Sequence, residues 1–175
     1  MKEIFDKRYF VTSFFLLVTG FVFLLMLITT GINFDQVKTL FQFGAMYGPI
    51  IRLFPEQFWR LFSAIFVHIG WEHFIVNMIS LYFLGQQVEE IFGSKQFFLL
   101  YLLSGMMGNL FVFAFTPKVL AAGASTSLYG LFAAIIVLRY ATRSPYIQQL
   151  GQSYLTLFVI NISREIGRAS CRERV

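Results

Sequence analysis

The chain has 175 residues, of which 57% are hydrophobic and 13% charged, and its net charge is +5. Soluble domains carry about 25% charged residues, so this composition excludes an ordinary soluble protein and predicts an all-α membrane protein. The single cysteine, Cys171, excludes an intramolecular disulfide and a cysteine-cluster metal site. The basic residues form no run with interleaved aromatic residues, so we expect contact with lipid and no nucleic-acid partner.

Residues 1–9 form a short charged segment, which we expect to be a cytoplasmic lead. Residues 10–30 are mostly apolar and are long enough to cross a bilayer, for which about 20 residues are needed. A signal peptide is the alternative, but its apolar region would be shorter, and no small-residue cleavage site lies near residues 29–31. We therefore predict a retained first span.

Residues 31–71 form a long connection in which polar and apolar residues are mixed. It has too few consecutive apolar residues to span a membrane, and connections of this length are usually functional. We expect an amphipathic segment in the membrane interface, with Trp59 and Trp71 at headgroup level. Arg52 and Arg60 would reach water.

Three further spans are predicted at residues 72–91, 96–115 and 125–140. A tight turn at residues 92–94 separates the first two, and a loop at residues 116–122 precedes the third. One face of the 96–115 helix carries the small and polar residues typical of helix packing in membranes: Ser104, Gly105, Gly108 and Asn109.

The C-terminal region is predicted to contain a loop at residues 141–152 and a fifth span that begins near Ser153. Only about ten apolar residues follow before the polar stretch 163–175, too few to cross a hydrocarbon core about 30 Å thick. The arginines of this stretch would also lie in or beyond a span that heads outward, against the positive-inside rule. We therefore expect residues 163–175 to be a non-native tail. A genuine basic terminus on a half-span is the alternative.

Ser125 lies where a loop enters the fourth predicted span, two residues after Gly123. A serine is a weak nucleophile unless a base removes its proton, and acyl transfer needs donors aimed at the developing oxyanion. The free N–H groups at a helix start favour negative charge there. His73 and Asn77 lie four residues apart on one helix face, and both side chains can donate to an oxyanion. Tyr129 lies one turn after Ser125 on the same face.

Each of these residues also has a structural interpretation. Serine and glycine in membrane helices are more often packing residues than catalytic ones, and Ser127 is assigned to packing. His73 alone could be a buried ring, and Asn77 alone could link two helices. Together with Trp59-Arg60 in the preceding loop, the set favours a serine-centred active site.

The ordered set of motifs resembles the rhomboid family of intramembrane serine proteases. The residues that carry the resemblance are Trp59-Arg60, His68, His73-x-x-x-Asn77, Gly123-x-Ser125 and Tyr129-Gly130. The resemblance covers residues 10–162 and implies a rhomboid-like six-span transmembrane bundle, of which about four and a half spans are present. The chain would then consist of the 1–9 lead, a 10–162 membrane domain truncated in its fifth span, and the 163–175 tail.

The resemblance implies a catalytic role for three side chains. Ser125 would be the nucleophile, while His73, Asn77 and the Ser125 backbone N–H would form the oxyanion hole. The reaction would be hydrolysis of a peptide bond in or beside a transmembrane helix of a membrane protein. Neither a metal nor a cofactor is implied. The partners would be transmembrane protein substrates and the lipid bilayer.

Further residues would support this site. Tyr129 would pack beside the catalytic base, and the small Gly123 would let a substrate backbone approach. Trp59-Arg60 would anchor the first loop at the membrane surface, and His68 would be a supporting polar residue. We expect a multi-pass protein of a bacterial plasma membrane with a cytoplasmic N-terminus.

One component of the family pattern is missing from this sequence. Rhomboids pair the serine with a histidine on a sixth span, whereas the two histidines here, His68 and His73, do not fit that role. Loss of a triad member costs several orders of magnitude in rate, so we expect this chain as written to be inactive. Two alternatives stay open: a non-catalytic rhomboid-like protein that binds or escorts clients, and a small transporter or channel lined by Ser125, His73 and Asn77.

Overall fold

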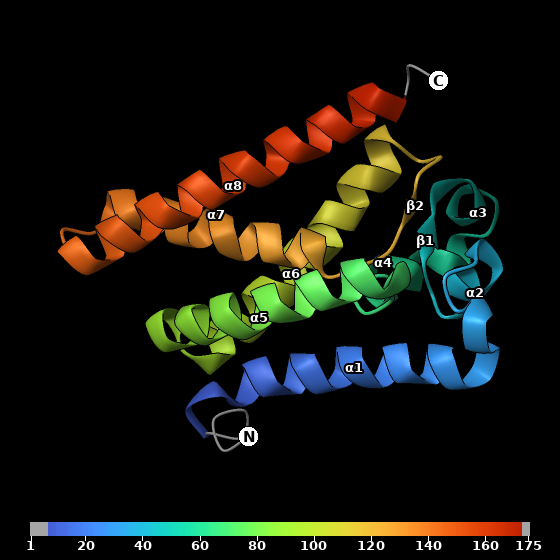
Figure 1. The fold of residues 1–175 in the computed structure, drawn as a ribbon, viewed down its shortest axis with the longest axis horizontal. Helices are drawn as coiled ribbons and strands as arrows, with labels where there is room; N and C mark the ends of the chain where they lie inside the picture. The colour runs from blue at the N-terminus through green and yellow to red at the C-terminus, as the bar shows by residue number, and fades with distance from the viewer. Residues whose placement is uncertain (1–6, 173–175) are drawn as a thin grey trace. The chain divides into compact units, whose positions relative to one another are not determined.

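The computed structural model of the chain describes residues 7–172, and these residues are almost entirely helical (Figure 1). The long helices are α1 (Phe10–Thr30), α5 (Gly70–Phe92), α6 (Ser94–Phe115), α7 (Ser125–Ala141) and α8 (Pro145–Arg172). The shorter elements are η1 (Lys7–Tyr9), η2 (Gly31–Asn33), α2 (Val37–Gln42), β1 (Met46–Tyr47), α3 (Gly48–Leu53), η3 (Pro55–Trp59), α4 (Arg60–Ser63) and β2 (Leu120–Ala121). The predicted all-α bundle is confirmed.

The chain divides into two compact units, Met1–Leu131 and Phe132–Val175. All candidate site residues belong to the first unit. In the second unit, the end of α7 packs closely on α8. The ring centroids of Phe132 and Tyr154 are 5.3 Å apart.

The predicted span limits agree closely with the helices. The first predicted span has the same limits as α1, and the predicted spans 72–91, 96–115 and 125–140 correspond to α5, α6 and α7 within two residues. Two helical stretches of the described chain, Phe10–Asn33 and Ser94–Phe115, are long and apolar enough to cross a membrane. Ser125–Ala141 is apolar but shorter. α5 is not among them, and its sequence carries Glu72, Asn77 and Glu89.

The prediction for the start of the fifth span is wrong. α8 begins at Pro145, not near Ser153, so the predicted 141–152 loop is mostly helical. Proline is favoured in the first turn of a helix because its missing N–H would have no partner there. The backbone stays helical to Arg172. Residues 173–175 of the predicted tail lie outside the described residues, and the origin of the tail stays a prediction.

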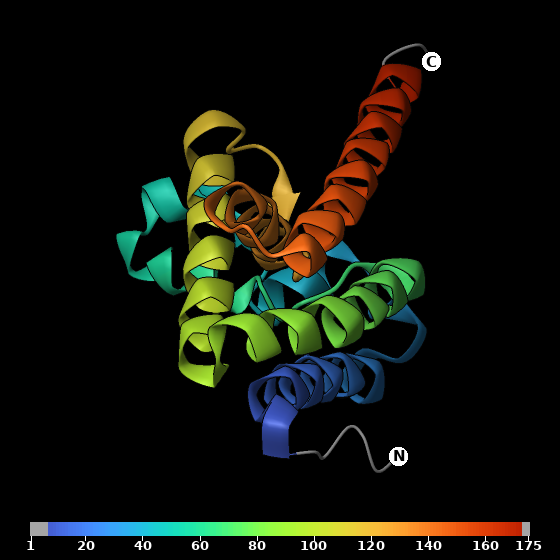
Figure 2. The ribbon, with the colours of Figure 1, turned by 90° about the vertical axis from the view of Figure 1, so that its left-hand side faces the viewer.

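Helices α1 and α5 lie side by side, and a buried carboxylate joins their ends (Figures 1 and 2). Glu89, near the end of α5, accepts hydrogen bonds from the Val11 N–H at 2.9 Å and from the Thr12 N–H at 2.8 Å. The hydroxyl groups of Thr12 and Ser94 also donate to this carboxylate, at 2.7 and 2.6 Å. Glu89 therefore caps the first turn of α1, where free N–H groups favour negative charge.

Aromatic packing fills the space between α1 and its neighbours. The buried ring of Phe15 stacks on Tyr101 of α6 with centroids 4.0 Å apart. Further along α1, the ring of Phe23 stacks on Phe74 of α5 at 3.9 Å. These contacts fix α1 against the two helices that flank the candidate site.

The long connection between α1 and α5 is folded into short helices and one strand, and the prediction that Arg60 reaches water is wrong. Arg60 is buried, and its guanidinium donates to the carbonyl groups of Phe41 at 2.6 Å and Ala45 at 3.1 Å. It also lies over the Phe41 ring at 3.7 Å. A cation can be buried here because backbone carbonyl groups satisfy its donors. Trp59 and Trp71 are about half exposed.

The segment between α6 and α7 also carries a short strand, which the sequence did not predict. β1 and β2 pair antiparallel, with Met46 opposite Ala121 and Tyr47 opposite Leu120. This pairing ties the first connection to the residues that lead into Ser125.

Candidate active site

The backbone that leads into Ser125 is held by two hydrogen bonds to the residues after α4. The Gly123 N–H donates to the Ala64 carbonyl at 2.8 Å. The Ala124 N–H donates to Nε2 of His68 at 3.3 Å. Ser125 follows as the first residue of α7, and its side chain is partly exposed. The serine therefore stands at a helix start whose approach is fixed by packing from another part of the chain.

His68 is fully buried, and its two hydrogen bonds define its tautomer. Nε2 accepts from Ala124, so Nδ1 carries the proton and donates to the Phe66 carbonyl at 3.3 Å. Burial, with a smaller contribution from the neighbouring His73, lowers the pKa of His68 from 6.5 to about 3. His68 is thus a neutral residue that positions the loop before Ser125.

Gly123 and His73 are in direct contact. A Cβ atom built on Gly123 would overlap the His73 imidazole, and Gly123 has a φ of +130°, which side-chain-bearing residues rarely adopt. Because His73 lies one turn into α5, this contact joins α5 to the approach to Ser125. The His68 and His73 rings are adjacent, with centroids 5.3 Å apart.

Asn77 is buried one turn after His73, as the spacing predicts. Its side-chain amide donates to the His73 carbonyl at 2.9 Å, a bond within its own helix. Among the side chains that the structure describes, none forms a hydrogen bond with the Ser125 hydroxyl. In apo structures catalytic hydrogen bonds are often long, so this geometry leaves the predicted roles open.

The small residues of α6 bring the start of α7 close to that helix. A Cβ on Gly105 would overlap the Ser127 hydroxyl, a Cβ on Gly108 would overlap Thr126, and a Cβ on Gly130 would overlap Ser104. The Asn109 side chain donates to the Leu61 carbonyl at 2.8 Å. The predicted packing face is therefore confirmed, and Ser127 is buried against it.

The remaining predicted residues lie around this centre. Tyr129 lies one turn after Ser125 in α7, and Trp59 and Arg60 belong to the folded first connection. The role of Ala64 was not predicted, because a backbone carbonyl that accepts a hydrogen bond leaves no signal in the residue type. The described residues contain no group of three or more His, Cys, Asp or Glu side chains that could hold a metal ion.

Gly123 leads into the helix start at Ser125 and contacts His73 of a neighbouring helix, in a helical chain with two stretches apolar and long enough to cross a membrane. Residues 55–169 match the Rhomboid domain. This match covers more than half of the chain, and the chain belongs to the rhomboid family.

Similar curated proteins come from distant organisms. The chain is 30% identical over 151 residues to Rhomboid protease GluP of Bacillus subtilis. The aligned region covers 86% of this chain and 29% of that protein. It is 32% identical over 129 residues to RHOMBOID-like protein 1 of Arabidopsis thaliana, or 74% of this chain and 33% of that protein. Inactive RHOMBOID-like protein 8 of the same plant is 31% identical over 81 residues, which are 46% of this chain and 23% of that protein. The chain thus spans about a third or less of the length of these relatives.

Proposed function

We propose that the chain is part of an intramembrane serine endopeptidase that hydrolyses peptide bonds in or next to transmembrane helices. The observation that carries this proposal is the contact of the Gly123–Ser125 turn with the His73 ring. Ser125 is the nucleophile. His73, Asn77 and the Ser125 N–H are the donors for the oxyanion that forms when the serine attacks the scissile carbonyl.

In this proposal, the general base that removes the Ser125 proton comes from outside the 175 residues. Both histidines of the sequence already have other positions: His68 accepts a hydrogen bond from the Ala124 N–H, and His73 lies against Gly123. A histidine contributed by a further part of the protein would remove the Ser125 proton, with Tyr129 packed beside it. The 175 residues alone would then hydrolyse substrate poorly, since a serine without its base loses several orders of magnitude in rate.

The proposed substrates are membrane proteins, cleaved where a transmembrane helix is locally unwound after a small residue. The partial exposure of Ser125 supports this, because a substrate has to reach the serine side chain. We place the protein in a bacterial plasma membrane with a cytoplasmic N-terminus. Lys2, Lys7 and Arg8 favour that orientation. Reporter fusions to the two ends of α1 test this orientation. If a reporter that works only outside the cytoplasm were active when fused at residue 9, the proposed orientation would be wrong.

Replacement of Ser125 tests the proposed nucleophile. In protein expressed from the complete reading frame, Ser125→Ala should abolish cleavage of a transmembrane reporter substrate, because the substitution removes the proposed nucleophile. Ser127→Ala is the matched control, since Ser127 is a buried packing residue two positions away, and it should retain cleavage. Normal cleavage by Ser125→Ala would rule out the mechanism.

A second candidate function is binding or escort of membrane clients without cleavage. Two observations favour it: a relative is named as inactive, and no hydrogen-bonded base contacts Ser125 within the described residues. This function predicts that Ser125→Ala and the unchanged protein stabilise the same client equally in a pulse-chase experiment. The protease proposal predicts that the client is cleaved by the unchanged protein alone.

A further inference from the structure

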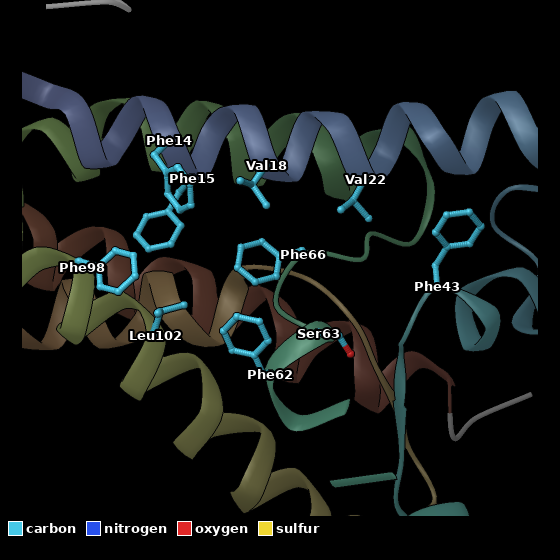
Figure 3. Close-up of a pocket in the computed structure, with 10 residues that line it drawn as sticks. All are labelled: Phe14, Phe15, Val18, Val22, Phe43, Phe62, Ser63, Phe66, Phe98 and Leu102. Atoms are coloured by element: carbon cyan, nitrogen blue, oxygen red, sulfur yellow. The ribbon is translucent and has the colours of Figure 1, made fainter. Parts of the chain in front are cut away.

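An apolar groove lies on the first unit, away from Ser125, between α1, α6 and the residues around α4 (Figure 3). Its volume is about 260 Å³. Val18 and Val22 form its α1 side, Phe98 its α6 side, and Phe62 and Phe66 lie opposite α1. Ser63 is the one residue with a polar side chain in this lining, and its hydroxyl already donates to the Gly44 carbonyl at 2.7 Å. The groove therefore offers an occupant only apolar contact.

A second, more open hollow lies nearer the N-terminus of α1. That hollow has a volume of about 420 Å³, shares Phe98 with the first, and is lined by Val11 and Lys95. The α1 residues of both cavities form one helix face, because Val11, Phe15, Val18 and Val22 are spaced by three or four residues. At 1.5 Å per residue this face is about 16 Å long. Half of a hydrocarbon core about 30 Å thick is about 15 Å, so the groove has the depth of one leaflet.

Lys95 places a positive charge at one end of this apolar groove. Among the described residues, no carboxylate forms an ion pair with its ammonium group. An ammonium group binds phosphate well, and a basic residue at the membrane surface attracts anionic headgroups. A charge at one end and apolar walls over one leaflet are complementary to a phospholipid.

An acyl chain suits this groove better than a helix does. An α-helix with its side chains is about 10 Å across or more, whereas an acyl chain has no side chains and needs far less width. A transmembrane helix of a substrate or of a second copy is the alternative occupant, and it would shield the groove from a lipid probe.

We propose that this groove binds a bilayer phospholipid, with one acyl chain along the α1 face from Val11 to Val22 and the phosphate beside Lys95. The bound chain would pack against Phe62 and Phe66. These two residues flank Ala64, whose carbonyl accepts the Gly123 N–H at 2.8 Å. The lipid would thus support the loop that fixes the approach to Ser125.

Photo-crosslinking with a lipid probe tests the acyl-chain site. The full protein is placed in phosphatidylcholine vesicles with a small fraction of phosphatidylglycerol that carries a diazirine on one acyl chain, and labelled peptides are mapped. We expect labels on the groove face of α1 and on Phe98, at least fivefold denser than on the exposed α5 residues Ile75 and Phe83. Uniform labelling of all lipid-facing helices would overturn the proposal, and this comparison needs no variant.

Paired substitutions then test the walls and the charge. Val18→Trp should fill the groove and lower its labelling at least fivefold, whereas Leu17→Trp, on the neighbouring exposed face, should leave it unchanged. Lys95→Gln should lower labelling by the phosphatidylglycerol probe about fivefold but not labelling by a diacylglycerol probe without phosphate. Lys118→Gln is the control, because it removes the same charge from a lysine that lines neither cavity, and it should leave labelling by both probes unchanged. Equal labelling in Val18→Trp and Leu17→Trp, or a Lys95→Gln effect on both probes, would contradict the proposed binding mode.

Discussion

At the level of single residues, Gly123 is the point where the site tolerates the least change. Its positive φ and its contact with the His73 ring leave no room for a side chain. We predict that Gly123→Ala destabilises the protein by about 1–3 kcal/mol. It should also lower the cleavage rate at least about tenfold, because the displaced His73 is a proposed oxyanion donor. Denaturant unfolding in detergent and cleavage assays measure the two effects.

The control for this substitution is Gly20→Ala. Gly20 lies in α1, and a methyl group added there would have no atom within 4 Å, so this change should be neutral or slightly stabilising. If Gly123→Ala behaved like Gly20→Ala in both assays, the tight contact between the loop and His73 would not matter for the site.

His68 makes the stability of the first unit dependent on pH. Its pKa is about 3 in the folded protein, below the ordinary value of 6.5, because the ring is buried. Between these values the unfolded chain binds more protons than the folded one, so stability is full above about pH 6.5 and falls as the pH falls toward 3. The free energy of unfolding should then fall by up to about 1.4 kcal/mol for each pH unit. Unfolding measured from about pH 7.5 to about pH 4.5 checks this.

The variant His68→Gln separates this effect from other titrating groups. Glutamine keeps a donor and an acceptor near Phe66 and Ala124 but does not titrate in this range. The variant should therefore be less stable at neutral pH, with a flatter pH dependence than the unchanged protein. Identical slopes in both proteins would show that His68 is not the group that titrates.

A polar residue in apolar surroundings is the feature from which the sequence predicts a site. Ser125, His73 and Asn77 are predicted in this way, and the structure brings His73 to the loop before Ser125, while their catalytic roles stay predictions. Arg60 was misjudged because its carbonyl partners, Phe41 and Ala45, belong to a loop fold that no periodicity encodes. The cap made by Glu89 was missed for a similar reason, since its partners in the first turn of α1 lie far away along the chain.

At the level of helices, the join between α1 and α5 depends on Glu89. Glu89→Ala removes the acceptor for the Val11 and Thr12 N–H groups and leaves these donors buried. We predict a loss of about 3 kcal/mol in the free energy of unfolding, measured by denaturant titration. The exposed neighbour Glu90 is the control, and Glu90→Ala should stay within about 0.5 kcal/mol of the unchanged protein. Similar losses in the two variants would refute the capping role.

Helix limits were predictable where composition changes sharply. The ends of α1 coincide with the ends of its apolar run, and α6 ends at the residue expected. The sequence predicts the start of α8 too late, because proline is typical of loops but is also favourable in the first turn of a helix. The β1–β2 pair could not be predicted, because two residues in each strand are too few to show alternation.

At the level of the whole molecule, the order of the motifs was more informative than any one of them. Trp59-Arg60, His73 with Asn77, and Gly123 with Ser125 occur in the order that the rhomboid family shows, and the Rhomboid domain match over residues 55–169 confirms the family. The catalytic roles rest on that membership together with the local geometry. They require a test that reports on the serine itself.

The most direct test is reaction of the protein from its complete reading frame with a fluorophosphonate, followed by peptide mass spectrometry. A fluorophosphonate modifies a serine only when a base and an oxyanion site activate it. The account predicts one modified residue, Ser125, with loss of labelling in Ser125→Ala and full labelling in Ser127→Ala. Cleavage of a transmembrane substrate by protein whose Ser125 stays unmodified, or modification at another serine, would contradict it.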